Sequence, residues 1–457
     1  MTLLITILIH TCLLGNGYLM ALVLGIKNKI EAVGIAYLLG SGAVSLLFLL
    51  NRWLFGLALD GGNFVLSLVM VLAVCLLIIH RREGSFNSLI DGLKLSRPVS
   101  LEKIVSFENL LVTMLLIIFS YSFLQNYFLP ITDWDSLALY DFRAKVIERT
   151  GEMSEGIELG YFFQYPPYTS FLHSFSYIFG IERAKVAYSF IYGSLLMGFY
   201  ALLKRRQKKW VALLGALTLA TDISIFEHSI IAYNNLAYLT FIALGLIYLW
   251  FWLLDSQKKD LLVGVLLVGL STWVRASEPF WALAAVIILL KIFRERKQFR
   301  LGILSLLSLW LIYKFWGAYT KHLYVLYNDQ VALEKKSVVE KLLARQHSVA
   351  AVIGNFKQVT LYFWENVLAV IRPLAPVLGL SVLADLYEKN KNNLLLLIVF
   401  LGLFVMIWAG TYVFSLFYDT WDLIGGSLQR VSMPLIPLAC FLIFNNSMWN
   451  KKLIEKR

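Results

Sequence analysis

The hydrophobic positions of this 457-residue chain fall into long continuous runs rather than into alternating or one-sided patterns. Because a helix needs about 20 consecutive apolar residues to cross the core of a bilayer, such runs are typical of membrane spans. The pattern predicts an all-α polytopic membrane protein with about thirteen transmembrane helices. The runs lie near residues 3–25, 32–50, 63–80, 107–128, 184–203, 210–226, 232–254, 261–274, 279–293, 301–318, 358–384, 393–416 and 430–446.

Composition agrees with this interpretation. Hydrophobic residues make up 59% of the chain and charged residues only 15%, a balance that excludes an ordinary soluble domain. The net charge of +12 comes from short lysine and arginine clusters between the apolar runs, which does not indicate a nucleic-acid partner. If the spans alternate in direction, these clusters all fall on one side of the membrane. They lie at residues 27–29, 81–103, 204–209, 258–259, 291–300, 389–391 and 451–457.

Lysine- and arginine-rich loops remain in the cytoplasm, so we expect the N-terminus outside and the C-terminus inside. The other polar residues then gather on the external side. This divides the chain into N-terminal transmembrane helices (1–128), an external loop with surface helices (129–183) and a C-terminal transmembrane region (184–457). The last part carries a further external segment at 319–357.

The external loop begins with "LPITDWDSLALYDFRAKVIER", residues 129–149. From Ser136 onward the spacing predicts a helix on the membrane surface. Its apolar face would hold Leu137, Tyr140, Ala144 and Ile147, and its polar face Asp141, Lys145 and Glu148. Asp135 stands where an N-cap would, but a cap needs one carboxylate and "DWD" supplies two beside an indole. A carboxylate pair at a membrane rim can also act as a general base.

Three motifs resemble the GT-C superfamily of membrane glycosyltransferases, which includes protein O-mannosyltransferases and aminoarabinose transferases. The stretch "WDSLALYDFRAKVI" (134–147) is similar to the catalytic loop of the bacterial branch that has a Trp-Asp pair. "YPPYTSFLHSFSYIFG" (165–180) resembles the proline element that follows, with Pro166 and Pro167 starting a new interfacial helix. "LQRVSMPLIPLA" (428–439) is similar to the last element.

The resemblance implies a GT-C-like fold and an inverting glycosyltransferase of the cell envelope, in the plasma membrane of a prokaryote. Such an enzyme moves a sugar from a polyprenyl-phosphate-linked donor to a lipid, glycan or protein acceptor on the outer face of the membrane. We expect no cofactor. A divalent metal is compatible with the chemistry, but no Cys/His cluster in the sequence supports one.

This chemistry needs a base for the proton of the acceptor and cations for the leaving phosphate. The resemblance favours Asp135 as the base, with Asp133 as the second candidate. The candidate donor-phosphate-binding residues are Arg275, Arg430, Arg143 and Lys145, and the candidate substrate contacts are Trp134, Tyr140, Tyr165 and Glu278.

Other interpretations remain open at this point. Arg275 and Glu278 can simply pair at a helix end, and His173 suits a packed aromatic face. A polysaccharide ligase or polymerase with a diphosphate-linked donor would concentrate arginines in a late external loop, whereas 319–357 holds only Arg345. A lipid or solute transporter would show internal repeats with broken spans at matching positions.

Overall fold

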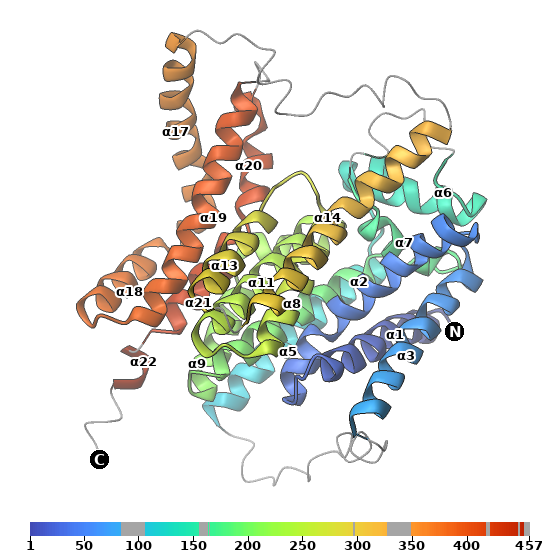
Figure 1. Cartoon of the computed structure of the whole chain (residues 1–457), viewed down its shortest axis with the longest axis horizontal. Helices are drawn as coiled ribbons and strands as arrows, with labels where there is room; N and C mark the ends of the chain where they lie inside the picture. The colour runs from blue at the N-terminus through green and yellow to red at the C-terminus, as the bar shows by residue number, and fades with distance from the viewer. Residues whose placement is uncertain are drawn as a thin grey trace.

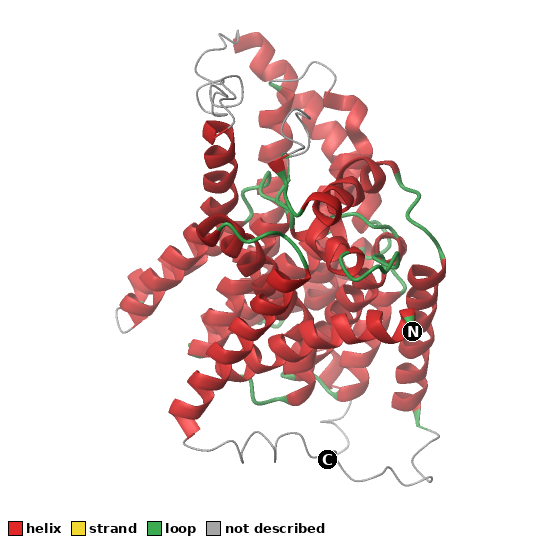
Figure 2. Ribbon diagram, turned by 90° about the vertical axis from the view of Figure 1, so that its right-hand side faces the viewer, coloured by secondary structure: helices red, strands yellow, loops and turns green. Residues whose placement is uncertain are grey.

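The computed structural model describes residues 1–83, 106–154, 163, 165–295, 298–326, 349–416, 421–446 and 448–451. Within these ranges the elements are helices and no strand occurs (Figures 1 and 2). They are α1 (Thr2–Val23), α2 (Lys29–Phe55), α3 (Gly61–Glu83), α5 (Phe107–Phe128), η2 (Ser136–Asp141), α6 (Phe142–Thr150), α7 (Tyr168–Tyr177), α8 (Val186–Lys204), α9 (Lys209–Ala220), α10 (Ile223–Ile230), α11 (Asn235–Asp255), α12 (Lys258–Val274), α13 (Trp281–Arg294), α14 (Phe299–Leu326), α17 (Val349–Ile371), α18 (Ala375–Tyr387), α19 (Lys391–Ser415), η5 (Trp421–Ile424), α20 (Gly425–Ser432), α21 (Leu435–Phe444) and α22 (Met448–Lys451).

Eight of the described helices are long and apolar enough to cross a membrane, and three bent helix pairs raise this to as many as eleven. The chain is therefore a multi-pass membrane protein. The bent pairs are α9 with α10 (65°), α17 with α18 (90°) and α20 with α21 (42°). The predicted count of about thirteen spans is not confirmed. Its remaining two runs, near 261–274 and 279–293, form α12 and α13, which have only 17 and 14 residues.

Small residues let the first two helices approach to backbone contact. A Cβ atom on Gly17 would lie 1.7 Å from the carbonyl oxygen of Ala36, and one on Gly40 would lie 1.9 Å from that of Leu13. No side chain fits at either position without moving a backbone. Small residues at helix contacts are a common means of packing within membranes, where van der Waals contact drives association.

Helices α11 and α12 form a hairpin whose open end is closed by a hydrogen bond. Arg275, directly after α12, donates from Nη1 to Oδ1 of Asn235, the first residue of α11, over 3.0 Å. The end of α12 therefore returns to the level at which α11 begins. Both residues line the same cavity, which is described below.

At the other end of this hairpin, Arg205 joins three helices. Its guanidinium contacts Glu31 of α2 at 2.5 Å and Asp260 of α12 at 2.8 Å, and Arg205 itself directly follows α8. Tyr248 of α11 donates to the same Glu31 carboxylate over 2.9 Å. Each carboxylate is buried, so the cluster combines charge pairing with hydrogen bonding.

The predicted surface helix is present but differs in register. Residues Ser136–Asp141 form a π-helix, whose turns are wider than those of an α-helix, and only Phe142–Thr150 is α-helical. Asp141 is consequently buried rather than on the polar face, and Leu137 is 41% exposed rather than packed. Asp141 and Lys145, four positions apart, form an ion pair at 2.7 Å. Most of the predicted external segment 319–357, including Arg345, lies outside the described residues.

Candidate functional site

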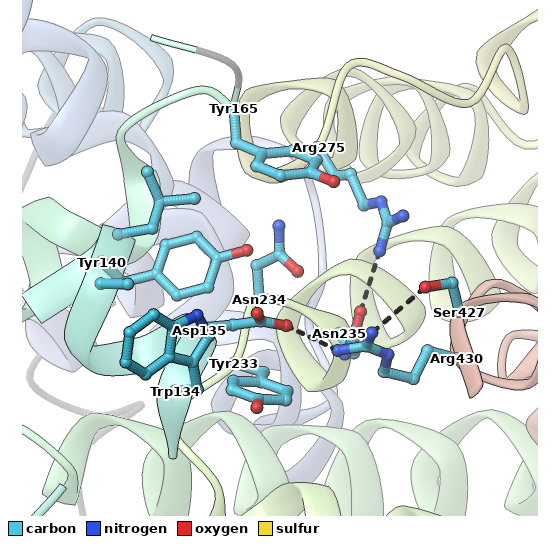
Figure 3. A pocket seen from close by; sticks show the side chains of 12 residues that line it. Trp134, Asp135, Tyr140, Tyr165, Tyr233, Asn234, Asn235, Arg275, Ser427 and Arg430 are labelled. Carbon is cyan, nitrogen blue, oxygen red and sulfur yellow. Dashed lines mark hydrogen bonds and ion pairs between the residues drawn. The ribbon is translucent and has the colours of Figure 1, made fainter. Parts of the chain in front are cut away.

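One cavity gathers residues from five distant parts of the chain (Figure 3). Its volume is about 430 Å³, and we call it the Asp135 cavity. Aromatic rings, amides and two arginines dominate its wall. The lining residues are Trp134, Asp135, Ala138, Leu139, Tyr140, Tyr165, Tyr233, Asn234, Asn235, Arg275, Ser427 and Arg430.

An ion pair crosses this cavity from the segment before η2 to α20. Nη1 of Arg430 lies 2.8 Å from Oδ2 of Asp135. Arg430 also donates to the hydroxyl of Ser427 over 3.2 Å, and its guanidinium carbon lies 5.5 Å from the ring centroid of Tyr233. Asp135 precedes η2 but makes no side-chain capping hydrogen bond, so its carboxylate faces the cavity instead of closing a helix end.

Arg275 is held more firmly than Arg430. Its Nη2 and Nε atoms contact the two carboxylate oxygens of Glu278 at 2.7 and 2.9 Å, and Nη1 donates to Asn235. The guanidinium carbon also lies 5.5 Å from the ring centroid of Tyr165. The pairing of Arg275 with Glu278 is thus present, and it places a fixed cation on the cavity wall. Glu278 does not line the cavity itself.

Arg143 and Lys145 do not line the Asp135 cavity. Arg143 is fully buried and donates from Nη1 to the carbonyl oxygen of Tyr165 over 2.9 Å. Burial lowers the pKa of Arg143 to about 9, so the group still carries its charge at neutral pH. Lys145 borders a second hollow of about 440 Å³.

The two aspartates of "DWD" differ in environment. Asp135 lines the cavity, whereas Asp133 does not. Asp133 instead acts electrostatically on Lys185, a buried lysine whose Nζ donates to the carbonyl oxygen of Pro130 over 3.3 Å. Trp134, between them, is 79% exposed and lies at the cavity edge.

Four polar lining residues are not among the candidates that the sequence predicts: Tyr233, Asn234, Asn235 and Ser427. The first three form a Tyr-Asn-Asn triplet at the start of α11. Polar residues at the first turn of an apolar span are a signal that the sequence contains.

Four aromatic side chains line the cavity: Trp134, Tyr140, Tyr165 and Tyr233. Burial raises the pKa of Tyr140, so its phenol keeps its proton at neutral pH.

A buried cluster under the loop fixes the position of η2 relative to α7. The carboxylate of Asp141 accepts hydrogen bonds from Tyr177 and Lys145 and lies 3.4 Å from Nδ1 of His173. Nε2 of His173 in turn lies 3.0 Å from the hydroxyl of Tyr188. Burial acts to raise the pKa of Asp141, but these three partners outweigh it and hold the pKa below its ordinary value. His173 is therefore a packed residue, as one sequence interpretation expects.

The Asp135 cavity combines a carboxylate, two guanidinium groups and several neutral hydrogen-bonding groups. Among the described residues, no group of three or more His, Cys, Asp or Glu side chains has the geometry of a metal site.

Comparison of the chain with protein-family models, with curated proteins and with solved structures finds no match.

Proposed function

We propose that the protein is a membrane glycosyltransferase of the GT-C type, which moves a sugar from a polyprenyl-phosphate donor to an acceptor on the outer face of the membrane. In this proposal the N-terminus is external and the C-terminus cytoplasmic. The Asp135 cavity is the reaction site.

The contact between Asp135 and Arg430 carries the proposal. Asp135 and Arg430 are 295 positions apart in the sequence, yet their side chains meet at 2.8 Å across a cavity that Arg275 also lines. A base and two cations around one space are what transfer from a phosphate leaving group requires. A membrane protein keeps such ionisable groups at the rim of its bundle mainly for function.

The groups suggest the following sequence of events. The donor phosphate competes with Asp135 for Arg430, and Arg275 contributes a second positive charge. Asp135, released from its ion pair, accepts the proton of the acceptor hydroxyl as the hydroxyl oxygen bonds to the anomeric carbon of the sugar. The bond from that carbon to the phosphate oxygen breaks, and the polyprenyl phosphate leaves with the electron pair. Attack from the face opposite the phosphate inverts the anomeric centre.

The test is Asp135→Asn, with Asp133→Asn as the matched variant two residues away. Asparagine keeps the shape of the side chain but cannot take the proton, so Asp135→Asn should lower transfer by about 10²–10⁴-fold. Asp133→Asn should retain most of the activity. The measurement is release of polyprenyl phosphate from synthetic polyprenyl-phosphate sugars by the full-length protein in membranes. If both variants turn over at the wild-type rate, the proposed reaction at this cavity is wrong.

A further inference from the structure

Asn234 presents an unused polar group to the Asp135 cavity. The residue is 2% exposed, and its Nδ2 atom has no hydrogen-bond partner among the residues that the structure describes. It occupies the position before α11 without making a side-chain capping bond. Buried polar groups are nearly always hydrogen-bonded, because leaving one unsatisfied is unfavourable. A group in this state on a cavity wall indicates a ligand atom that binds to it.

Two aromatic residues share the cavity wall with this amide. Tyr140 and Tyr165 both line the cavity, with ring centroids 6.5 Å apart, and Figure 3 shows Asn234 between them and Arg430. The neighbouring amide, Asn235, is already used, because its Oδ1 accepts from Arg275. Asn234, Tyr140 and Tyr165 therefore form a subsite with an amide and two phenols. Hydroxyl groups of a sugar ring match such donors and acceptors, and its C–H faces match the aromatic rings.

Every charged group of the wall is engaged elsewhere. Asp135 pairs with Arg430. In the proposed reaction Asp135 must take a proton and Arg430 must hold the phosphate. Arg275 is bound by Glu278, whose oxygen also accepts from Ser277 over 2.6 Å. Among the described lining residues, no carboxylate is left for an ammonium group on the sugar, and no guanidinium is left for a carboxylate on it. A charged sugar would enter without a counter-ion, which is costly in a site with little water.

From this arrangement we propose that Asn234, Tyr140 and Tyr165 form the subsite for the transferred sugar, and that this sugar is an uncharged, hydroxylated ring. The inference rests on the proposed function and adds the class of sugar and the residue that selects it. Asn234 is assigned as the specificity-determining residue.

The experiment compares three synthetic polyprenyl-phosphate donors that carry a neutral hexose, a 4-amino sugar with a positive charge, or a uronic acid with a negative charge. The readout is free sugar released by water, so that no acceptor needs to be known. In this slow reaction water attacks the anomeric carbon, Asp135 takes its proton, and polyprenyl phosphate leaves. The protein is the full chain in lipid nanodiscs, as wild type, Asn234→Leu and Asn234→Asp.

We expect the wild type to prefer the neutral donor. Asn234→Leu, which keeps the branched shape of the side chain but has no hydrogen-bonding group, should lower kcat/KM for that donor by about 10- to 100-fold. Asn234→Asp should raise the ratio of cationic to neutral donor use by at least about tenfold, because it adds a carboxylate. That ratio does not depend on how much of the variant folds. Asn16→Leu, at a buried asparagine of α1 away from the cavity, is the matched control and should leave the donor preference unchanged.

Two failures are distinguishable. If the wild type releases sugar readily from a charged donor and poorly from the neutral one, or if Asn234→Asp leaves the ratio unchanged, the assignment of Asn234 is wrong while the proposed function stands. If the wild type releases sugar from none of the three donors, the proposed function and the inference built on it both fall.

Discussion

The buried guanidinium of Arg143 donates a hydrogen bond to the carbonyl oxygen of Tyr165, 2.9 Å away. This bond connects α6 to the segment that carries one aromatic ring of the Asp135 cavity. Tyr165 in turn lies beside Arg275, whose guanidinium carbon is 5.5 Å from the tyrosine ring centroid. Arg143 therefore supports Tyr165 without lining the cavity itself. Its hydrogen bond fixes the segment that carries Tyr165 relative to the loop that carries Asp135.

Arg143→Leu should destabilise the protein by about 1–3 kcal/mol, since it leaves a carbonyl oxygen of the Tyr165 segment without its donor. It should also raise KM for the donor, because Tyr165 loses its support. Thermal unfolding and donor kinetics of the full-length protein measure the two effects. Arg149→Leu is the matched control, because Arg149 is exposed on the same helix. Its effect on stability should stay within about 0.5 kcal/mol. Equal unfolding temperatures for the two variants would contradict the supporting role of Arg143.

Arg275→Ala and Arg430→Ala should each lower donor use by about 10²–10³-fold, the usual effect of removing one group that stabilises developing negative charge. Lysine at either position should restore only part of this, because it lacks the planar fork of arginine. Initial rates with the preferred polyprenyl-phosphate sugar provide the measurement. Arg206→Ala serves as control, since Arg206 pairs with Asp255 at the other end of α11. A lysine variant as active as the wild type would show that the fork is not used.

The charge of Asp141 makes the stability of the folded protein depend on pH. Since its pKa in the folded protein lies below the ordinary value of 3.8, the folded state favours the charged carboxylate. The stabilisation is fully present above that value and is lost as the pH falls below it. Asp141→Asn should thus be less stable than wild type near neutral pH, and the difference should shrink below about pH 4. Thermal unfolding from about pH 7 to pH 3 tests this, with the exposed Glu148→Gln as control. A difference that stays constant over this range would argue against a charged Asp141.

The proposed orientation can be examined with single cysteines. In a background without Cys12, Cys75 and Cys440, Glu148→Cys and Lys258→Cys place thiols at exposed positions of the predicted external and cytoplasmic sides. A maleimide that cannot cross membranes should label the first variant in intact cells and the second only after the cells are opened. The reverse result would invert the topology and place the Asp135 cavity on the cytoplasmic side.

Hydropathy alone predicts the helical membrane protein, because apolar runs longer than the bilayer core leave few alternatives. It does not predict where a run bends, and the pairs α9–α10, α17–α18 and α20–α21 each break within a region that reads as continuous. Hydropathy therefore predicts that membrane spans are present but does not fix their number.

The candidate site was predictable only in part. Asp135, Arg275 and Arg430 have charges that stand out against an apolar background, and the structure places all three on one cavity. Hydropathy does not single out Asn234 and Asn235, because an average over an apolar window hides two amides at its edge. The spacing predicts an exposed Asp141, but the residue is buried because the π-helix of Ser136–Asp141 has a different period from an α-helix. No feature of the spacing marks that change of period.

The cluster around Arg205 holds one side of the helix bundle together. It fastens α2, the end of α8 and the hairpin of α11 and α12 to one another at the end of the hairpin opposite to Asn235 and Arg275. Asn235 and Arg275, at the open end of this hairpin, belong to the fastened part of the cavity wall. Ser427 and Arg430 come from α20, which precedes the 42° bend before α21. If the cavity widens to admit a lipid-linked sugar in the proposed reaction, we therefore expect the change at α20 and not at the fastened end of the α11–α12 hairpin.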